Sequence, residues 1–495
     1  MNFFRKLGFA ALLASLLAPA LRAEVHCPAI FSDHMVLQRD RVVPVWGDGE
    51  PGERIAVEIA GQRKITIAGA SGQWRVTLDA LDASAEPRPL TVRGTNTLTY
   101  TDVLVGEVWF CSGQSNMEKQ LGPRHGQKPT DRYEEEIKQA DCPLLRLYQV
   151  TQRGKPQARI TGLRWLPCSP ETVTSTEFSA AAYYFGRELQ RKLGVPVGLI
   201  HSSFGGTRIE AWMPAAAFAG SPVLQGLDQV PYDHWVEGVQ ATELYRSMVA
   251  PFTSYALRGF LWYQGEANCM NAESLIYAEK QRALIRGWRA AWGEPDAPFY
   301  FVLLAPFAYS HQKNWAKQLT PDALPVLWEA QVRALDVPHT GIVATTDLAG
   351  DGKDIHPTNK RDVGLRLARL ALADTYGWRD IQARSPQYQS FHRPMWSKAL
   401  VVEFKDSYGL HSSDGQPLTN FEIAGADQKF LPAQVVIKHD KVIVSNPEVP
   451  KPVAVRFGWN ELAMPNLVNA SDLPAIPFRT DDWPLVLNVP KAAPR

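Results

Sequence analysis

An apolar run that ends in a turn of small residues constrains the fold of this chain more than any other feature. Residues 103–110 read Val-Leu-Val-Gly-Glu-Val-Trp-Phe, and residues 111–117 read Cys-Ser-Gly-Gln-Ser-Asn-Met. The run predicts a buried strand, and the small residues predict a turn that carries Ser115 into a helix. A hydroxyl placed there lies beside free backbone N–H groups, which stabilise developing negative charge. The pattern indicates a nucleophile elbow, although a helix cap is the commoner reason for a serine in such a turn.

The middle third of the chain alternates predicted strands with predicted helices. Apolar runs predict strands, and amphipathic stretches predict helices of a length suited to cross between parallel strands. The sequence therefore predicts an α/β fold, a three-layer αβα domain built on a parallel sheet. The expected strands are 103–110, 195–202, 259–263, 298–305 and 340–346, and the expected helices are 180–192, 272–292 and 357–376.

The two flanks of this region have a different pattern. Short alternating runs separated by glycines, such as 42–46, 55–59 and 73–78, predict a small antiparallel β-sandwich before it. Runs at 399–404, 434–437 and 441–444 predict a second β domain after it. The predicted divisions are a signal peptide at 1–23, an N-terminal β-sandwich at 24–102, a catalytic α/β domain at 103–383 and a C-terminal β domain at 384–495.

The start of the chain predicts export. A basic beginning, an apolar core from Leu7 and small residues at Ala20 and Ala23 are typical of a secretory signal peptide, with cleavage expected after either alanine. No later segment predicts a membrane span. We therefore expect a secreted protein, with the periplasm as the expected compartment. In that setting Cys142 and Cys168 are a candidate disulfide pair among five cysteines.

The overall charge argues against a polyanionic partner. The formal net charge is +1, so we expect no binding to nucleic acid. No cysteine spacing resembles a zinc site, and the aspartates near position 350 are too irregularly spaced for a cation loop. We expect neither a metal nor an organic cofactor.

Four segments rich in functional side chains follow predicted strands. Because the carboxyl ends of parallel strands meet at one edge of a sheet, these segments are expected to converge. A serine nucleophile needs a base, an acid that orients the base, and donors for an oxyanion. The segments contain Ser115, the pair Gly205-Gly206, the run 264–268 and the run from Asp347 to Pro357.

The last of these segments supplies the base. His356 precedes Pro357, which is expected at the first helical position, so the imidazole would lie just outside a helix start. Asp354 lies two residues earlier, so in an extended segment its carboxylate shares a face with the imidazole. Asp347, Asp351 and Glu266 are the alternative acids.

The second and third segments supply donors. Gly205 and Gly206 allow backbone N–H groups to approach a ligand without a side chain between them. The side-chain amides of Asn268 and Gln264 are further candidate donors.

These segments together resemble the blocks of the SGNH (GDSL-like) hydrolases, and within them the sialate O-acetylesterase branch, which includes acetyl esterases of plant polysaccharides. The flanks at 31–38 and 469–481 are also similar to that branch. The resemblance covers nearly the whole chain after the predicted signal peptide. The four blocks are Gly113–Met117, Phe204–Thr207, Trp262–Asn268 and Asp354–Pro357.

The resemblance implies roles for individual residues. Ser115 would be the nucleophile and His356 the general base, with the backbone N–H groups of Ser115 and Gly206 as oxyanion donors beside an amide of the third block. That block reads Gln-Gly-Glu instead of Gly-x-Asn-Asp, so Asn268 and Gln264 compete for the last role. Asp precedes His by two residues instead of three, so the acid is Asp354 or, next, Glu266.

The hypothesis is a secreted serine esterase that removes O-acetyl groups from carbohydrates. Arg208, Gln114 and Glu266 are candidate substrate-binding residues, Arg208 as the partner of a sialate carboxylate. An esterase of acetylated hemicellulose is the alternative, followed by a non-catalytic carbohydrate-binding protein. The sequence leaves the oligomeric state open.

Overall fold

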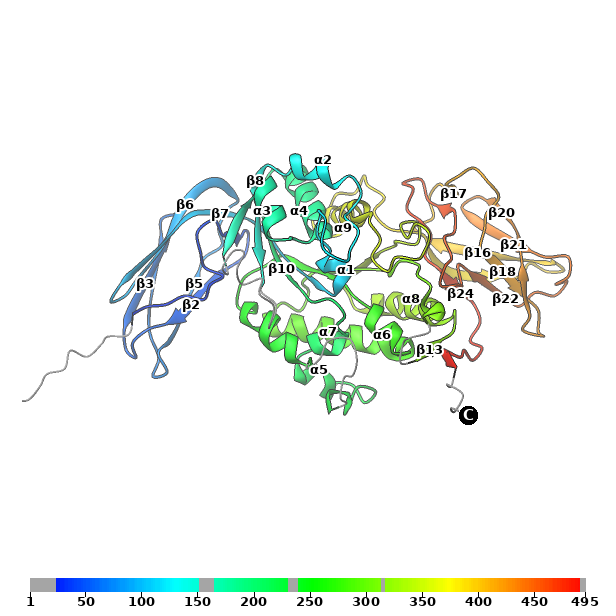
Figure 1. The fold of residues 1–495 in the computed structure, drawn as a ribbon, viewed down its shortest axis with the longest axis horizontal. Helices are drawn as coiled ribbons and strands as arrows, with labels where there is room; N and C mark the ends of the chain where they lie inside the picture. Colours follow the sequence, from blue (N-terminus) through cyan, green and yellow to red (C-terminus); the bar gives the residue numbers. More distant parts are fainter. Residues whose placement is uncertain (1–23, 151–163, 230–238, 313–316, 490–495) are drawn as a thin grey trace, which may run out of the picture.

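The computed structural model describes residues 24–150, 164–229, 239–312 and 317–489 (Figure 1). The predicted signal peptide at 1–23 lies outside these ranges. An elongated molecule places β structure at both ends and an α/β domain between them (Figure 1).

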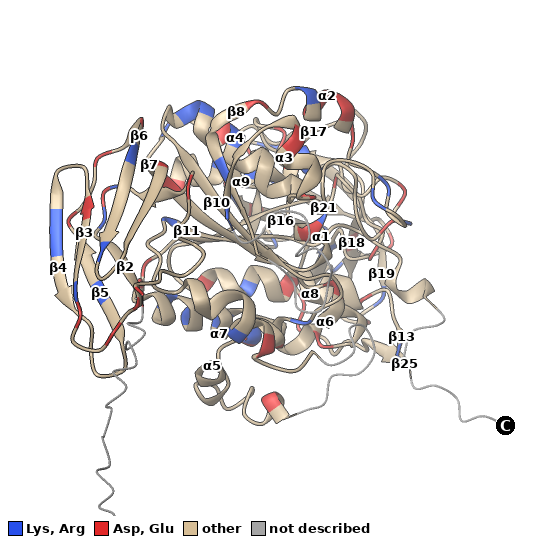
Figure 2. Ribbon diagram, turned by 60° about the vertical axis from the view of Figure 1, so that its left-hand side comes forward, with Lys and Arg blue, Asp and Glu red and all other residues tan. Residues whose placement is uncertain are grey.

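The central sheet has the strand order β14-β12-β11-β7-β10-β8-β9. Neighbouring strands are parallel except for the antiparallel pair β8 and β9 at one edge. The inner strands β10 and β11 contain no Lys, Arg, Asp or Glu (Figure 2) and are buried throughout, as expected for a sheet covered on both faces. The bounds are β7 Thr97–Gly113, β8 Cys142–Gln149, β9 Trp165–Cys168, β10 Val197–Ser203, β11 Gly259–Tyr263, β12 Phe299–Val302 and β14 Thr340–Val343.

Helices cover both faces of this sheet (Figure 1), so the predicted three-layer arrangement is confirmed. Helices α4 and α9 pack together on one face, and α7 packs with α8 and α5 on the other. Gly194 and Gly293 end α4 and α7 in the left-handed conformation that glycine adopts most easily. The helices are α1 Ser115–Glu118, α2 Tyr133–Lys138, α3 Pro170–Ser175, α4 Ala180–Leu193, α5 Ala215–Ala219, α6 Glu266–Met270, α7 Ser274–Trp292, α8 Ala323–Arg333 and α9 Lys360–Asp374.

The predicted start of the last helix is wrong. Helix α9 begins at Lys360, because the side chain of Asn359 accepts a hydrogen bond from the backbone N–H of Asp362 and caps the helix there. Pro357 therefore lies in the preceding loop, and His356 stands several residues before the helix.

Strand β7 joins the N-terminal β region to the central sheet. Its first half pairs with β6, and its second half pairs with β10 and β11. The predicted boundary at 102/103 falls inside this strand. Glu107 on β7 is fully buried and bonded to Arg39 and Arg258, which ties the two regions together. The N-terminal strands are β1 Val36–Gln38, β2 Val43–Asp48, β3 Arg54–Ile59, β4 Gln62–Ile67, β5 Gln73–Leu78 and β6 Ser84–Arg93.

The C-terminal β domain has its own hydrophobic core, formed by residues such as Val402, Ile423 and Phe457. Its two larger sheets have the orders β15-β16-β21-β20 and β19-β18-β22-β24. The predicted strands at 399–404, 434–437 and 441–444 are all present. The strands are β15 Gln387–His392, β16 Ala399–Lys405, β17 His411–Ser412, β18 Phe421–Ala424, β19 Phe430–Pro432, β20 Gln434–Lys438, β21 Lys441–Ser445, β22 Ala454–Phe457, β23 Leu467–Val468 and β24 Phe478–Arg479, while β25 Asn488–Val489 pairs with β13 Gln318–Leu319.

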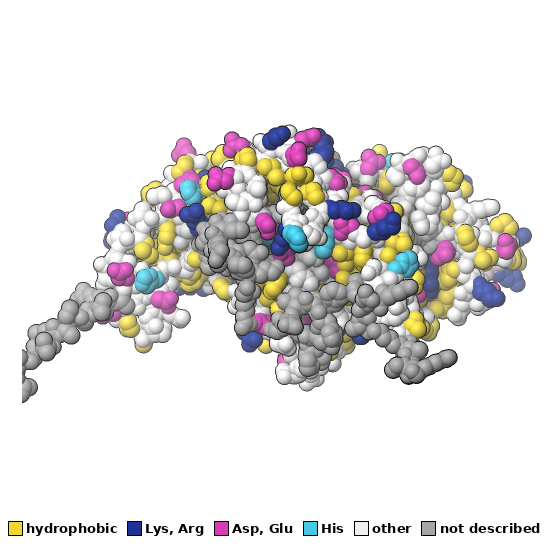
Figure 3. Space-filling view, viewed as in Figure 1, with side chains coloured by type: hydrophobic (Ala, Val, Ile, Leu, Met, Phe, Trp, Pro, Cys, Tyr) yellow, Lys and Arg dark blue, Asp and Glu magenta, His cyan; other side chains and the backbone are white. Residues whose placement is uncertain are grey.

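The surface agrees with the small net charge. Basic and acidic side chains are interspersed over the face seen in Figure 3. In the described ranges, no helix is long and apolar enough to cross a membrane. Within the same ranges, no three His, Cys, Asp or Glu side chains are grouped in a way that could hold a metal ion.

Candidate active site

Ser115 lies at the turn between β7 and α1, at the carboxyl edge of the sheet. Gly113 permits this turn because its φ is +145° and an added Cβ would lie 2.1 Å from the carbonyl oxygen of Tyr263. Gln114 then precedes the helix, whose first residue is Ser115. Asn116 and Met117 are buried, whereas Ser115 is partly exposed. The turn therefore presents the predicted nucleophile at the surface of a rigid strand end.

The loop after β10 lies directly against this serine. A Cβ added to Gly205 would lie 3.3 Å from the Cβ of Ser115. The backbone N–H of Gly205 donates to Glu118 Oε2 at 2.6 Å, and Arg124 binds the other oxygen of that carboxylate at 3.1 Å. Glu118, three residues after Ser115, thereby fixes the glycine loop beside the nucleophile.

Two backbone donors remain available in this corner. The backbone N–H groups of Ser115 and Gly206 have no acceptor among the described residues. Gly206 has a φ of +74°, a conformation that glycine adopts without strain. Two such donors beside the serine fit the requirement for binding an oxyanion.

His356 reaches the same edge from the loop before α9. The side-chain amide of Asn116, the residue after Ser115, donates to the carbonyl of Ile355, the residue before His356, at 2.9 Å. The sheet therefore brings together the predicted nucleophile and base segments, which are far apart in the sequence. The His356 side chain retains 22% of its exposure.

Asp354 holds the histidine loop in a turn. Its Oδ1 accepts the backbone N–H of His356 at 2.8 Å and lies 3.9 Å from His356 Nδ1. The carboxylate is thus within ion-pair range of the imidazole, though beyond a direct hydrogen bond. The predicted extended segment is instead a local turn, because the carboxylate of Asp354 accepts the backbone N–H of His356.

Burial lowers the pKa of His356 to about 4. The positive charges of Lys360 and Lys119 act in the same direction, whereas the carboxylates of Asp354 and Glu118 raise this pKa. The imidazole is therefore neutral around pH 7, which is the form that accepts a proton.

The alternative acids are engaged elsewhere. Asp347 forms a two-oxygen ion pair with Arg366 at 2.5–2.7 Å. Asp351 is exposed and pairs with Lys353 at 3.2 Å. Glu266 is buried and accepts a hydrogen bond from Asn116. Of the four candidates, Asp354 is the one that the structure places at His356.

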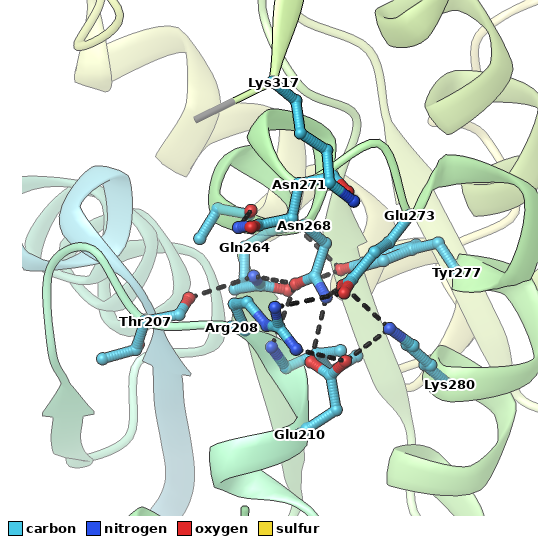
Figure 4. A network of polar contacts seen from close by, with 12 residues as sticks. Thr207, Arg208, Glu210, Gln264, Asn268, Asn271, Glu273, Tyr277, Lys280 and Lys317 are labelled. Atoms are coloured by element: carbon cyan, nitrogen blue, oxygen red, sulfur yellow. Dashed lines mark hydrogen bonds and ion pairs between the residues drawn. The ribbon is translucent and has the colours of Figure 1, made fainter. Parts of the chain in front are cut away.

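The expected amide donors of the third block belong to a buried polar network (Figure 4). Both amide hydrogens of Asn268 are donated to carboxylates, to Glu210 at 2.9 Å and Glu273 at 2.8 Å. Gln264 Nε2 points to three acceptors, on Gln114, Thr207 and Asn268. The expectation that either amide serves as an oxyanion donor is therefore not supported, because tertiary partners already use them.

Arg208 belongs to the same network. Its guanidinium lies 3.1 Å from Glu273 and 3.6 Å from Glu210, and Lys280 binds both carboxylates from α7. The expected partner of a sialate carboxylate is thus already compensated by acidic groups (Figure 4).

The side-chain amide of Gln114, the residue before Ser115, has its oxygen bonded and its nitrogen available. Its Oε1 accepts from Gln264 Nε2 at 3.0 Å and from the backbone N–H groups of Ala267 at 3.2 Å and Gly265 at 3.4 Å. Because the oxygen is fixed in this way, the orientation of the amide is determined. Its Nε2 has no acceptor among the described residues.

Three residues of the site were not identified from the sequence: Asn116, Glu118 and Lys360. All three lie within four residues of Ser115 or His356. The signal in the sequence that could have identified these three residues is their proximity to Ser115 and His356. Their bonds to Ile355, Gly205 and Asn116 depend on tertiary structure.

Comparison with known proteins identifies the family of this chain. The family model described as carbohydrate esterase, sialic acid-specific acetylesterase matches residues 105–373, more than half of the chain. Sialate O-acetylesterases of Homo sapiens and Pongo abelii are each 27% identical over 490 residues, covering 90% of this chain and 91% of theirs. The solved structure of a carbohydrate acetylesterase from Xanthomonas citri is 37% identical, with a TM-score of 0.80, and the match covers 93% of this chain and 100% of that one. The chain therefore belongs to the sialic acid-specific acetylesterase family of carbohydrate esterases, which are carboxylic ester hydrolases.

Proposed function

We propose that this protein is a serine esterase that removes O-acetyl groups from carbohydrates through an acetyl-serine intermediate. Ser115 Oγ attacks the acetyl carbonyl while His356 accepts the hydroxyl proton. The carbonyl oxygen, now negatively charged, is bound by the N–H groups of Ser115 and Gly206, with the amide of Gln114 as the side-chain donor. His356 then gives its proton to the departing sugar oxygen. Water attacks the acetyl-serine with the same histidine as base and releases acetate.

One observation carries this proposal. The bond between Asn116 and the carbonyl of Ile355 joins the chain neighbours of Ser115 and His356. The loop that contains Gly205 and Gly206 lies in the same corner, because a Cβ added to Gly205 would contact the Cβ of Ser115. Asp354 is the proposed acid, because its carboxylate lies 3.9 Å from the imidazole and distances in such sites shorten when substrate binds.

Replacement of the nucleophile tests the mechanism. Ser115→Ala should lower kcat for a chromogenic acetyl ester by a factor on the order of 10⁶, as loss of the nucleophile does in serine hydrolases. Ser254→Ala is the matched control, because Ser254 lies before β11, at the amino end of the sheet. Undiminished turnover by Ser115→Ala would refute the mechanism.

A neutral acetylated polysaccharide, such as hemicellulose, is a second candidate substrate beside acetylated sialic acid. The ion pairs of Arg208 with Glu210 and Glu273 favour it, because a guanidinium bound by two carboxylates has little to offer a substrate carboxylate.

Acetate release separates the two substrates. We would compare 9-O-acetyl sialic acid with acetylated xylan and xyloglucan oligosaccharides, for the wild type and for Arg208→Met. If Arg208 binds a sialate, the substitution raises KM for the sialic acid substrate alone. If the substrate is neutral, the wild type prefers the hemicellulose fragments.

Export is also part of the proposal. Residues 1–23 have the order of a basic start, an apolar core and small residues that signal peptidases cleave. The mass of the protein recovered from the periplasm of a bacterial host should correspond to cleavage after Ala20 or Ala23. An uncleaved chain in the cytosolic fraction would contradict export.

A further inference from the structure

A buried chain of hydrogen bonds runs from Glu266 through Asn116 to Lys360. Asn116 Nδ2 donates to Glu266 Oε1, and Lys360 Nζ donates to Asn116 Oδ1 at 2.6 Å. The three side chains come from α6, α1 and α9, and all are at least 98% buried. Lys360 also lies 5.0 Å from the centre of the Tyr263 ring, a cation–π contact.

The contacts of Asn116 allow a single orientation of its amide. Its two N–H bonds are used by two acceptors, Glu266 Oε1 and the carbonyl of Ile355. Its oxygen faces the ammonium of Lys360, which can only donate. No other residue of this size offers two donors on one side and an acceptor on the other. The pattern therefore requires an amide at position 116.

This chain of bonds spans the two catalytic segments. Asn116 follows Ser115, and the carbonyl that it binds belongs to Ile355, which precedes His356. Lys360 is the first residue of α9, the helix that follows the histidine loop. Glu266 is the first residue of α6, at the end of β11. One side chain thus connects the segments that follow β7, β11 and β14 at the carboxyl edge of the sheet.

Burying two opposite charges inside a protein costs free energy. A protein in which apolar residues of similar size replace such a pair is often equally stable. Burial raises the pKa of Glu266 to about 7 and lowers the pKa of Lys360 to about 7. Such a cost argues that the bridge specifies a particular arrangement of the site.

The bridge also acts on the base through charge. Lys360 lowers the pKa of His356, together with Lys119, while Asp354 and Glu118 raise it. Lys360 is itself affected by Lys119, which lowers its pKa, and by Glu266 and Asp354, which raise it. Removing the ammonium would therefore let His356 bind a proton at higher pH.

We propose that Glu266, Asn116 and Lys360 form a positioning bridge that holds His356 against Ser115. This inference rests on the proposed serine mechanism. None of the three contacts the reacting atoms in this account; each acts through the two catalytic residues. Glu266, expected above to bind substrate or serve as the acid, is assigned a positioning role instead.

Asn116→Asp tests the geometry with almost no change of shape. A carboxylate oxygen would then face Glu266 Oε1 and the Ile355 carbonyl, and these contacts become repulsive. We expect kcat to fall by about 10²-fold, because small misplacements of reacting groups have effects of that size. Glu266→Gln keeps an oxygen that accepts a hydrogen bond from Asn116, so its kcat should fall less than that of Asn116→Asp.

Lys360 tests the electrostatic part with a readout that loss of stability alone would not change. In Lys360→Met the low-pH limb of kcat/KM should move to higher pH, because a positive charge near His356 is gone. Lys360→Gln should show the same shift but recover part of the lost kcat, because its amide can still donate to Asn116. Lys353→Met is the control: Lys353 lies in the same loop, 83% exposed and paired with Asp351.

The outcomes separate the bridge from the mechanism. If Ser115→Ala is inactive while Asn116→Asp and both Lys360 variants keep the wild-type kcat and pH profile, the bridge is refuted and the serine mechanism stands. If Ser115→Ala is fully active, the mechanism itself fails. Should Asn116→Asp not fold, the two Lys360 variants decide: a purely structural lysine would leave the low-pH limb of both variants where it is in the wild type.

Discussion

At the residue scale, His356 is the group whose chemistry depends most on its surroundings. Its ordinary pKa is 6.5, and burial beside Lys360 and Lys119 lowers it to about 4. The folded protein therefore binds this proton at lower pH than the unfolded chain. Any stability that this difference contributes is present above pH 6.5 and is lost as the pH falls through about 4.

The activity should follow the same pKa. Since the neutral imidazole is the base, kcat/KM for an acetyl ester without titrating groups should stay level from neutral pH downwards and fall with a midpoint near the His356 value of about 4. Steady-state rates measured across that range, with folding followed by circular dichroism, test this. A midpoint at or above 6.5 would contradict the lowered pKa.

Asp354→Asn tests the proposed acid. Removing the carboxylate removes a charge that raises the pKa of His356, so the midpoint should move further down. We expect kcat to fall by about 10²-fold, because the imidazolium formed during attack loses its nearest counter-charge. Asp351→Asn, at an exposed aspartate of the same loop, is the control. Equal rates for both variants would remove Asp354 from the mechanism.

At the scale of secondary structure, β8 and β9 place two cysteines opposite each other at the edge of the sheet. Cys142 pairs with Cys168 in the antiparallel register, and both are free thiols in this structure. A hydrogen bond from the Cys168 thiol is the main reason that the pKa of Cys142 is lowered to about 7, with Arg187 adding to the effect. A thiolate beside a thiol is the arrangement from which a disulfide forms on oxidation.

We predict that oxidised glutathione converts this pair to a disulfide and raises the melting temperature. Closing the loop between the two residues should stabilise the fold by about 3 kcal/mol in the chain-entropy model. Thermal unfolding of the wild type and Cys142→Ala, each with and without reductant, tests this, with peptide mass mapping of the bridge. An identical melting temperature with and without reductant, and no bridged peptide, would contradict it.

The secondary structure was largely predictable because its signals are local. The 180–192 helix has an amphipathic pattern and a terminal Gly194, and the strand at 259–263 is a short apolar run. The start of α9 was mispredicted at Pro357. Asn359, two residues after this proline, is a better N-cap than His356, and the helix begins after it.

The site was predictable only in part. Ser115, Gly205, Gly206 and His356 follow strand ends, so the parallel sheet brings them together. The sequence does not show that the amide of Asn268 is already bonded within the fold, because its partner Glu210 is distant in the chain and its partner Glu273 is brought to it by the turn before α7. A lysine near the start of a helix is usually solvated, so the sequence does not indicate that Lys360 is buried. The folded structure shows that it is.

At the scale of the whole molecule, the C-terminal β domain packs against the loops of the site. The buried carboxylate of Glu461 accepts the backbone N–H of Ser310 at 2.9 Å and its hydroxyl at 2.5 Å. A Cβ added to Gly352, in the histidine loop, would lie 2.6 Å from Leu462. The domain therefore supports the segment that carries Asp354 and His356.

Glu461→Ala should weaken this contact. Two donors on Ser310 would lose their acceptor, which should lower the free energy of unfolding by about 2–3 kcal/mol. The rate kcat should also fall, because the Ser310 loop is joined to the histidine loop by the hydrogen bond from Ala308 N–H to the carbonyl of Gly352 at 3.2 Å. Urea unfolding and acetyl ester turnover measure both effects. Glu448→Ala, at an exposed glutamate of the same domain, is the control, and matching stability and rates for the two variants would contradict the supporting role.

The central claim is that Ser115 carries the acetyl group between the two halves of the reaction. Rapid quenching of the protein with an acetyl ester at low pH, followed by peptide mass spectrometry, tests it most directly. The account predicts one acetyl group on the peptide containing Ser115, absent in Ser115→Ala and strongly diminished when His356 is replaced, because the same histidine is the base for the attack by Ser115. Turnover with that peptide unmodified under every condition, or acetylation at another residue, would contradict it.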